Sequence, residues 1–198
     1  QLEEAERYIR KAIEINPIFS QAYYNLGNVL RDLGKLKEAE LLTRKAIELN
    51  PNFSDAYLNL GYILRDNRKL EEAELVTRKA IKINHYSSKA HANLGNILEE
   101  LGKDEEAIKY KIKSVELDPK DDDLVISLAH NLRGYQRYEL ALKYLSMNNS
   151  NSCQSLYLGC LLSLDKEKEF NEKYNELSAK KACNAEIGGI VEHANIIY

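Results

Sequence analysis

The sequence predicts an all-α fold, a solenoid in which short helical hairpins stack one upon the next. Two observations support this prediction. Equivalent residues recur every 34 positions, and the apolar residues within each period follow the spacing of an amphipathic helix. The recurring residues are a leucine, an alanine and a glycine, at Leu26, Leu60, Leu94 and Leu128; at Ala5, Ala39, Ala73, Ala107 and Ala141; and at Gly27, Gly61 and Gly95. Such a solenoid buries apolar surface between neighbouring hairpins instead of in one central core.

The first complete unit spans residues 20–53 and contains two amphipathic runs. Apolar residues at helical spacing predict a first helix through Ala22 and Leu30, and Gly34 supplies its stop signal. A second helix is expected from Leu36 to Leu49. It should end at Asn50, because the residue before a proline avoids the helical region.

The same pattern predicts further units at residues 54–87, 88–121 and 122–146, the last of them degenerate because Ala129 replaces the glycine. Residues 1–19 hold only the second half of a unit, so the array is expected to cover residues 1–146. Residues 147–198 are expected to form divergent helices of the same type and a C-terminal capping region, with a last helix in residues 183–198.

Three glycines at one phase indicate a close approach of two helices. Glycine inside a helix costs about 1 kcal/mol relative to alanine, so its recurrence implies that a side chain would not fit. The recurring alanine of the second helix is the expected counterpart. The three cysteines are not at equivalent positions, and Cys153 and Cys160 are expected to be small buried residues of one helix in a reduced, cytoplasmic protein.

Composition and motifs argue against several functions. The chain has 28 basic and 31 acidic residues, a net charge of −3, and lacks the basic stripe of a nucleic-acid-binding protein. It shows no apolar stretch that could span a membrane, no signal peptide, and no nucleophile elbow, phosphate loop or zinc spacing. We therefore expect no catalytic residues, cofactor or metal site in this sequence.

The units resemble the tetratricopeptide repeat (TPR). Residues 1–146 match its pattern well and residues 147–198 only loosely, while Thr43 and Thr77 depart from its usual aromatic residue. In the first complete unit the signature positions hold Tyr23, Leu26, Gly27, Leu30, Ala39, Ala46 and Pro51. The resemblance implies a right-handed superhelix of antiparallel helix pairs, in which the first helix of each pair lines a concave groove that binds peptides.

Transferring that geometry residue by residue implies a set of groove residues. The candidate peptide-binding residues are Tyr24, Asn25, Asn28, Arg31, Asn59, Tyr62, Arg65, Lys89, Asn93 and Asn96. Among these, Asn25, Asn59 and Asn93 share one phase and are similar to the asparagine ladder in the TPR arm of O-GlcNAc transferases. Such amides could hold a peptide backbone, or they could simply be exposed polar residues.

Two further hypotheses concern charge in the groove. A chaperone-type carboxylate clamp would match at Asn28, Asn59 and Lys89, but Tyr24 and Asn93 replace two of its basic residues, which removes most of its charge-assisted bonding. Arg31 and Arg65 recur at one phase, and each is followed by an aspartate. They could form ion pairs between units or recognise an acidic ligand.

The function that best fits the sequence is a protein-interaction scaffold whose partner is a protein or peptide segment. The alternative is a substrate-recruiting arm cut from a longer enzyme of the glycosyltransferase, sulfotransferase or 2-oxoglutarate oxygenase type, because the chain enters partway through a repeat. End-to-end self-association through uncapped apolar ends is a third expectation.

Overall fold

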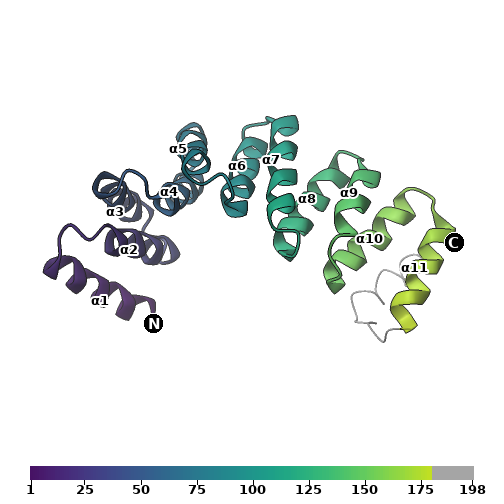
Figure 1. The fold of residues 1–198 in the computed structure, drawn as a ribbon, viewed down its shortest axis with the longest axis horizontal. Coiled ribbons are helices and arrows are strands. Elements are labelled where there is room, and N and C mark those ends of the chain that lie inside the picture. Colours follow the sequence, from purple (N-terminus) through teal and green to yellow (C-terminus); the bar gives the residue numbers. More distant parts are fainter. Residues whose placement is uncertain (180–198) are drawn as a thin grey trace. The chain divides into compact units, whose positions relative to one another are not determined.

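The computed structural model describes residues 1–179, which form helices joined by short turns, with no strand within that range (Figure 1). This confirms the predicted all-α fold. The helices are α1 (Leu2–Ile15), α2 (Ser20–Asp32), α3 (Leu36–Leu49), α4 (Ser54–Asp66), α5 (Leu70–Ile83), α6 (Ser88–Glu100), α7 (Asp104–Leu117), α8 (Asp122–Gly134), α9 (Tyr138–Leu145), α10 (Asn151–Ser163) and α11 (Glu167–Ala179). The helix predicted in residues 183–198 lies outside the described residues.

The chain divides into two compact units, Gln1–Tyr110 and Lys111–Tyr198, with the division inside α7. The predicted limit of the array at residue 146 therefore falls within the second unit, between α9 and α10. In the first unit, α2 pairs with α3 and α4 pairs with α5, while α3 against α4 and α5 against α6 join successive pairs. The first helices of these pairs also contact one another, α2 with α4 and α4 with α6, so they form a continuous row.

Apolar clusters of the first unit lie where one hairpin meets the next. Leu26, Leu30 and Ala39 of the first hairpin bury Ile63 of the following one. A second cluster repeats the arrangement one period later, with Leu60, Leu64, Ala73 and Ile97. This is the packing expected of a solenoid, in which each hairpin is stabilised by its neighbours.

The hairpin turns share one left-handed backbone position. Gly34 and Gly102 occupy it with φ of 74° and 71°, and Arg68 occupies the equivalent place with φ of 61°. The backbone N–H of Lys35 donates to the carbonyl oxygen of Leu30 at 2.8 Å, which closes the end of α2 in the manner of a Schellman motif. Gln136 and Asp165 hold the same conformation in the second unit, with φ of 58° and 52°.

The recurring glycines pack against threonines. A Cβ atom built on Gly27 would collide with Oγ1 of Thr43, and one built on Gly61 would collide with Oγ1 of Thr77. The predicted close approach is therefore confirmed at these two positions. The backbone of the recurring alanine, Ala39, also lies near Gly27, but the threonine hydroxyl is the atom that leaves no room for a side chain.

A ladder of ion pairs links the second helices of successive hairpins. The carboxylate of Glu40 accepts one hydrogen bond from Arg44 of its own helix at 3.0 Å and another from Lys69 of the next hairpin at 2.8 Å. Arg44 also donates a hydrogen bond to Glu72 of that hairpin. The pattern recurs at Glu6, Arg10, Lys35 and Glu38, and again at Glu74, Arg78, Lys103 and Glu106. Burial alone would raise the pKa of Glu40, but the bonds from Lys69 and Arg44 outweigh it and lower that pKa.

The second unit keeps the hairpin arrangement with a shorter second helix. Helix α9 has 8 residues, whereas α3 has 14, and this shortening is why the 34-residue period fades after residue 146. Helix α10 packs against α8, α9 and α11. Asn148 is buried between α9 and α10, where its Nδ2 donates to Oδ1 of Asp122 at 2.8 Å. A polar contact therefore stabilises the segment between the two helices.

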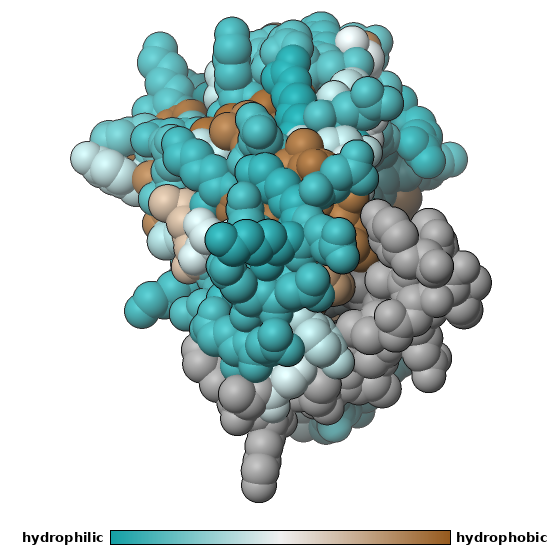
Figure 2. All heavy atoms as spheres, turned by 90° about the vertical axis from the view of Figure 1, so that its right-hand side faces the viewer, coloured by the Kyte–Doolittle hydropathy of each residue, from teal (hydrophilic) through white to brown (hydrophobic). Residues whose placement is uncertain are grey.

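Cys153 and Cys160 are buried free thiols of α10, as predicted. Burial raises the pKa of both thiols, which keeps them in the unreactive protonated form. Within residues 1–179, none of the helices is both long and apolar enough to cross a membrane. Among the residues that Figure 2 colours by hydropathy, most of the visible surface is hydrophilic, with smaller apolar areas between the polar side chains.

The glycine–threonine contact gives a first testable prediction. Gly27→Ala should destabilise the protein by about 1–2 kcal/mol, because overpacking outweighs the gain in helix propensity. In a Thr43→Ala background the same change should cost nothing or stabilise, because the colliding oxygen is gone. Urea unfolding of the two single variants and the double variant measures this coupling. An equal cost of Gly27→Ala in both backgrounds would contradict it.

The ion-pair ladder gives a prediction about pH. Because folding lowers the pKa of Glu40, its stabilisation is present above the unfolded pKa of about 4.3 and is lost as the pH falls through the lower folded value. Glu40→Gln should therefore reduce the free energy of unfolding by about 1–2 kcal/mol at pH 7 and by much less at pH 3. Urea midpoints at both pH values test this, with the exposed Glu48→Gln as the matched control.

Candidate functional site

A groove of about 430 Å³ runs across the row of first helices in the first unit. We call it the α2–α4–α6 groove. Its lining residues are Tyr24, Asn28, Arg31 and Asp32 of α2, Asp55, Leu58, Asn59 and Tyr62 of α4, and Lys89 of α6. The structure therefore brings together Tyr24, Asn28, Arg31, Asn59, Tyr62 and Lys89 from the predicted set, whereas Arg65 is not among the lining residues.

The groove combines aromatic surface with charges of both signs. The ring of Tyr24 lies 5.0 Å from that of Phe53 at a tilted angle, so this side chain is supported from behind. Two cations, Arg31 and Lys89, share the lining with the carboxylates of Asp32 and Asp55. The surface is therefore suited to a ligand that offers both hydrogen-bonding groups and apolar side chains.

Two arginines from successive hairpins lie near the ring of Tyr62. The guanidinium carbon of Arg31 is 5.4 Å from the centroid of the Tyr62 ring, and that of Arg65 is 5.7 Å from it. Both distances fall within the range of cation–π attraction. Burial raises the pKa of Tyr62, although the charges of Arg65 and Arg31 act against that shift.

The asparagine ladder expected on the groove surface is largely internal. Asn59 and Asn93 are only 3% and 1% exposed, so the prediction that they present open amides to a ligand is wrong. Each amide is used within the protein. Nδ2 of Asn59 donates to Oγ1 of Thr43 at 3.2 Å, while its Oδ1 accepts from Nη1 of Arg31 at 3.0 Å.

The same bonds recur one period later. Asn93 donates to Thr77 at 3.2 Å and accepts from Arg65 at 3.0 Å. We call each of these sets an amide lock: Arg31, Asn59 and Thr43 form the first, and Arg65, Asn93 and Thr77 form the second. A buried polar group without a partner is costly, and these amides can be buried because the nitrogen and the oxygen of each have a partner.

Asn25 has the same phase but a different environment. It is exposed, and its Oδ1 accepts a hydrogen bond from Nε2 of Gln21 at 3.0 Å. Ile9 occupies the place in α1 that the threonines occupy in α3 and α5, so it cannot offer Asn25 a hydroxyl. Asn96 is half-buried in α6 and is not among the residues that line the groove.

Thr43 and Thr77 are the residues whose role sequence reasoning missed. The signal for it was present, because Thr43, Asn59 and Arg31 recur together as Thr77, Asn93 and Arg65. One period later all three change together, to Lys111, Ser127 and Glu99. Positions that appear and disappear together are expected of residues that contact one another.

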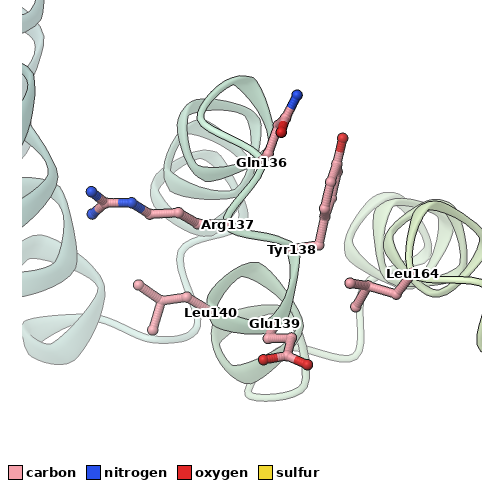
Figure 3. Close-up of a pocket in the computed structure, with 6 residues that line it drawn as sticks. All are labelled: Gln136, Arg137, Tyr138, Glu139, Leu140 and Leu164. Atoms are coloured by element: carbon pink, nitrogen blue, oxygen red, sulfur yellow. The ribbon is translucent and has the colours of Figure 1, made fainter.

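A second type of hollow lies at the hairpin turns. In the second unit it has about 380 Å³, and Figure 3 shows its lining from the α8–α9 turn, the start of α9 and the residue after α10: Gln136, Arg137, Tyr138, Glu139, Leu140 and Leu164. The corresponding turn of the first unit forms a hollow of about 440 Å³ around Gly34 and Asn67. Its recurrence at equivalent turns with different side chains indicates a feature of hairpin packing.

One buried histidine has contacts that stabilise the fold. Nε2 of His91 lies 3.1 Å from the carbonyl oxygen of His85, and its ring stacks on Tyr110 with centroids 5.7 Å apart. Within residues 1–179, no group of three His, Cys, Asp or Glu side chains is placed to hold a metal ion.

Comparisons with known proteins agree with the repeat fold. Three family models described as tetratricopeptide repeat match residues 20–53, residues 42–74, and residues 1–19 together with 88–121. A comparison with curated proteins gives no match.

Several solved structures share the fold. The Pseudomonas aeruginosa protein pilF has a TM-score of 0.73 at 21% identity and covers 97% of this chain and 90% of its own. YrrB, described as a TPR protein with an unusual peptide-binding site, has a TM-score of 0.63 at 19% identity, with 93% and 97% covered. MamA 41-end from Desulfovibrio magneticus RS-1 has a TM-score of 0.64 at 22% identity, and the match covers 73% of this chain and 82% of that one. Identities this low show a common fold only.

The amide locks predict unequal effects of chemically identical substitutions. Asn59→Ala should reduce the free energy of unfolding by about 1–3 kcal/mol, because it leaves Thr43 and Arg31 without their partner. Asn25→Ala removes the same side chain from an exposed site and should change stability by no more than about 0.5 kcal/mol. Chemical denaturation followed by circular dichroism compares the two. Equal effects would contradict the lock.

Proposed function

The chain belongs to the tetratricopeptide repeat family, and we propose that it is a protein-interaction scaffold that holds a peptide segment of a partner protein in the α2–α4–α6 groove. The observation that carries this proposal is the convergence of Tyr24, Asn28, Arg31, Tyr62 and Lys89 on one groove. Its volume of about 430 Å³ lies within the usual range of ligand sites.

The lining residues suit a peptide on chemical grounds. Tyrosine supplies a large amphipathic contact area at a low entropic cost, and Tyr24 and Tyr62 are both half-buried with part of the ring accessible. The amide of Asn28 can donate to a backbone carbonyl oxygen and accept from a backbone N–H at the same time. Lys89 is exposed and can reach toward a bound segment.

The proposal differs from an asparagine ladder in the residues that contact the ligand. The amides of Asn59 and Asn93 are occupied by the locks, so neither is assigned to contact with the ligand, although Asn59 borders the groove. Contact with the peptide is assigned to Tyr24, Asn28 and Lys89, with Arg31 and Tyr62 in the same lining and Arg65 beside the Tyr62 ring. The description of YrrB as a peptide-binding TPR protein supports this class of function by analogy of fold.

Peptide selection tests the proposal. Twelve-residue peptides displayed on phage are selected on the intact chain, and their affinities are measured by fluorescence anisotropy. Tyr24→Ala should weaken the selected peptides about tenfold or more, as expected for a buried aromatic anchor. Tyr8→Ala, which removes an exposed tyrosine of α1 outside the groove, is the matched control.

Lys89→Ala is the second groove variant and should also weaken binding. Failure to select any peptide would contradict the proposal. So would selected peptides whose affinities are unaffected by both Tyr24→Ala and Lys89→Ala, because their site would then lie elsewhere.

A further inference from the structure

The two arginines beside Tyr62 are fixed in position before any ligand arrives. Arg31 is tied through Nη1 to the buried amide of Asn59, which is in turn tied to Thr43. A flexible arginine side chain loses conformational entropy when it binds a ligand, and a guanidinium group that is already held in place loses less. The lock thus converts a mobile cation into a preorganised one.

Arg65 is held by the equivalent lock, and the two guanidinium groups share one aromatic ring. Arg31 and Arg65 lie 5.4 Å and 5.7 Å from the centroid of Tyr62. Their side chains remain 27% and 23% exposed. Arg31 lines the groove, and Arg65 lies next to it, beside the ring of the lining residue Tyr62. Each guanidinium carries five N–H donors, and the lock uses only one of them.

The remaining contacts of these arginines are weak and exposed. Arg31 pairs with Asp32 at 3.1 Å, and Arg65 lies 3.7 Å from Asp66 and 3.8 Å from Glu100. The two aspartate side chains are 50% and 41% exposed. Exposed ion pairs of this kind contribute little stability. A ligand carboxylate that binds a guanidinium group through two hydrogen bonds can therefore replace them.

Charge complementarity decides the class of ligand. We infer that Arg31 and Arg65, held by the amide locks against Tyr62, form an anchoring site for acidic side chains of the peptide bound in the α2–α4–α6 groove. The inference rests on the proposed function, since it names the ligand chemistry of the same groove. Asp32 and Asp55 in the lining oppose a dense polyanion, so the ligand is a peptide with a few Asp or Glu residues among apolar ones.

Two matched peptide arrays test the inference. One contains nine-residue peptides with Glu or Asp placed singly and in pairs among Ala, Ser, Leu and Tyr, and the other has Gln or Asn at those positions. Anisotropy titrations against the intact chain should show about tenfold tighter binding of the best acidic peptides than of their amide counterparts. The preference should shrink as salt is raised.

Variants separate anchoring from a purely structural role. Arg31→Gln and Arg65→Gln should each abolish the preference for acidic peptides, while Arg31→Lys should retain part of it because the charge remains. Arg7→Gln is the matched control, since Arg7 also lies over a tyrosine ring, that of Tyr8, at 5.3 Å and outside the groove. Circular dichroism and urea midpoints establish that each variant is folded.

The outcomes are distinguishable. Equal affinity for both arrays would overturn the inference and leave the proposed groove function intact. An acidic preference that survives Arg31→Gln and Arg65→Gln would overturn it as well. Binding by neither array, with selection of displayed peptides also failing, would overturn the proposed function together with this inference.

Discussion

The close approach of paired helices at Gly27 and Gly61 is the constraint from which the groove follows. Only a small hydroxyl fits against each glycine, and Thr43 and Thr77 supply it. A buried hydroxyl can accept a further hydrogen bond, and the asparagine of the next hairpin donates it. That asparagine then holds an arginine at the edge of the groove. A steric requirement between the paired helices thereby determines the position of a side chain at the groove.

Sequence periodicity predicted the hairpins well because it depends on the interior. The predicted second helix from Leu36 to Leu49 agrees with α3, since regular apolar spacing, a glycine stop and a proline mark its ends. Periodicity gives the phase of a residue but not its neighbours. Asn25 and Asn59 share a phase, yet one is exposed and the other buried, because α1 offers Ile9 where α3 offers Thr43.

The same limit applies to the groove. Tyr24, Asn28 and Lys89 could be placed from the resemblance because residues at those phases lie on the first helices, whose row is set by the repeat. The resemblance could not predict the amide locks, because their hydrogen bonds join residues that are 16 and 28 positions apart in the sequence. The near-neutral composition also gave no sign of the ion-pair ladder at Glu6, Glu40 and Glu74, because its acidic and basic side chains neutralise one another.

The hairpin turn accepts different residues without changing its geometry. Gly34, Arg68, Gly102, Gln136 and Asp165 all adopt left-handed dihedral angles and are all exposed, although three of them carry side chains that disfavour this region. The packing of the flanking helices must therefore dictate the turn. Such a position can drift in sequence while its backbone stays fixed. It is consequently a place where a fluorophore or cross-linker could be attached without altering how the helices pair.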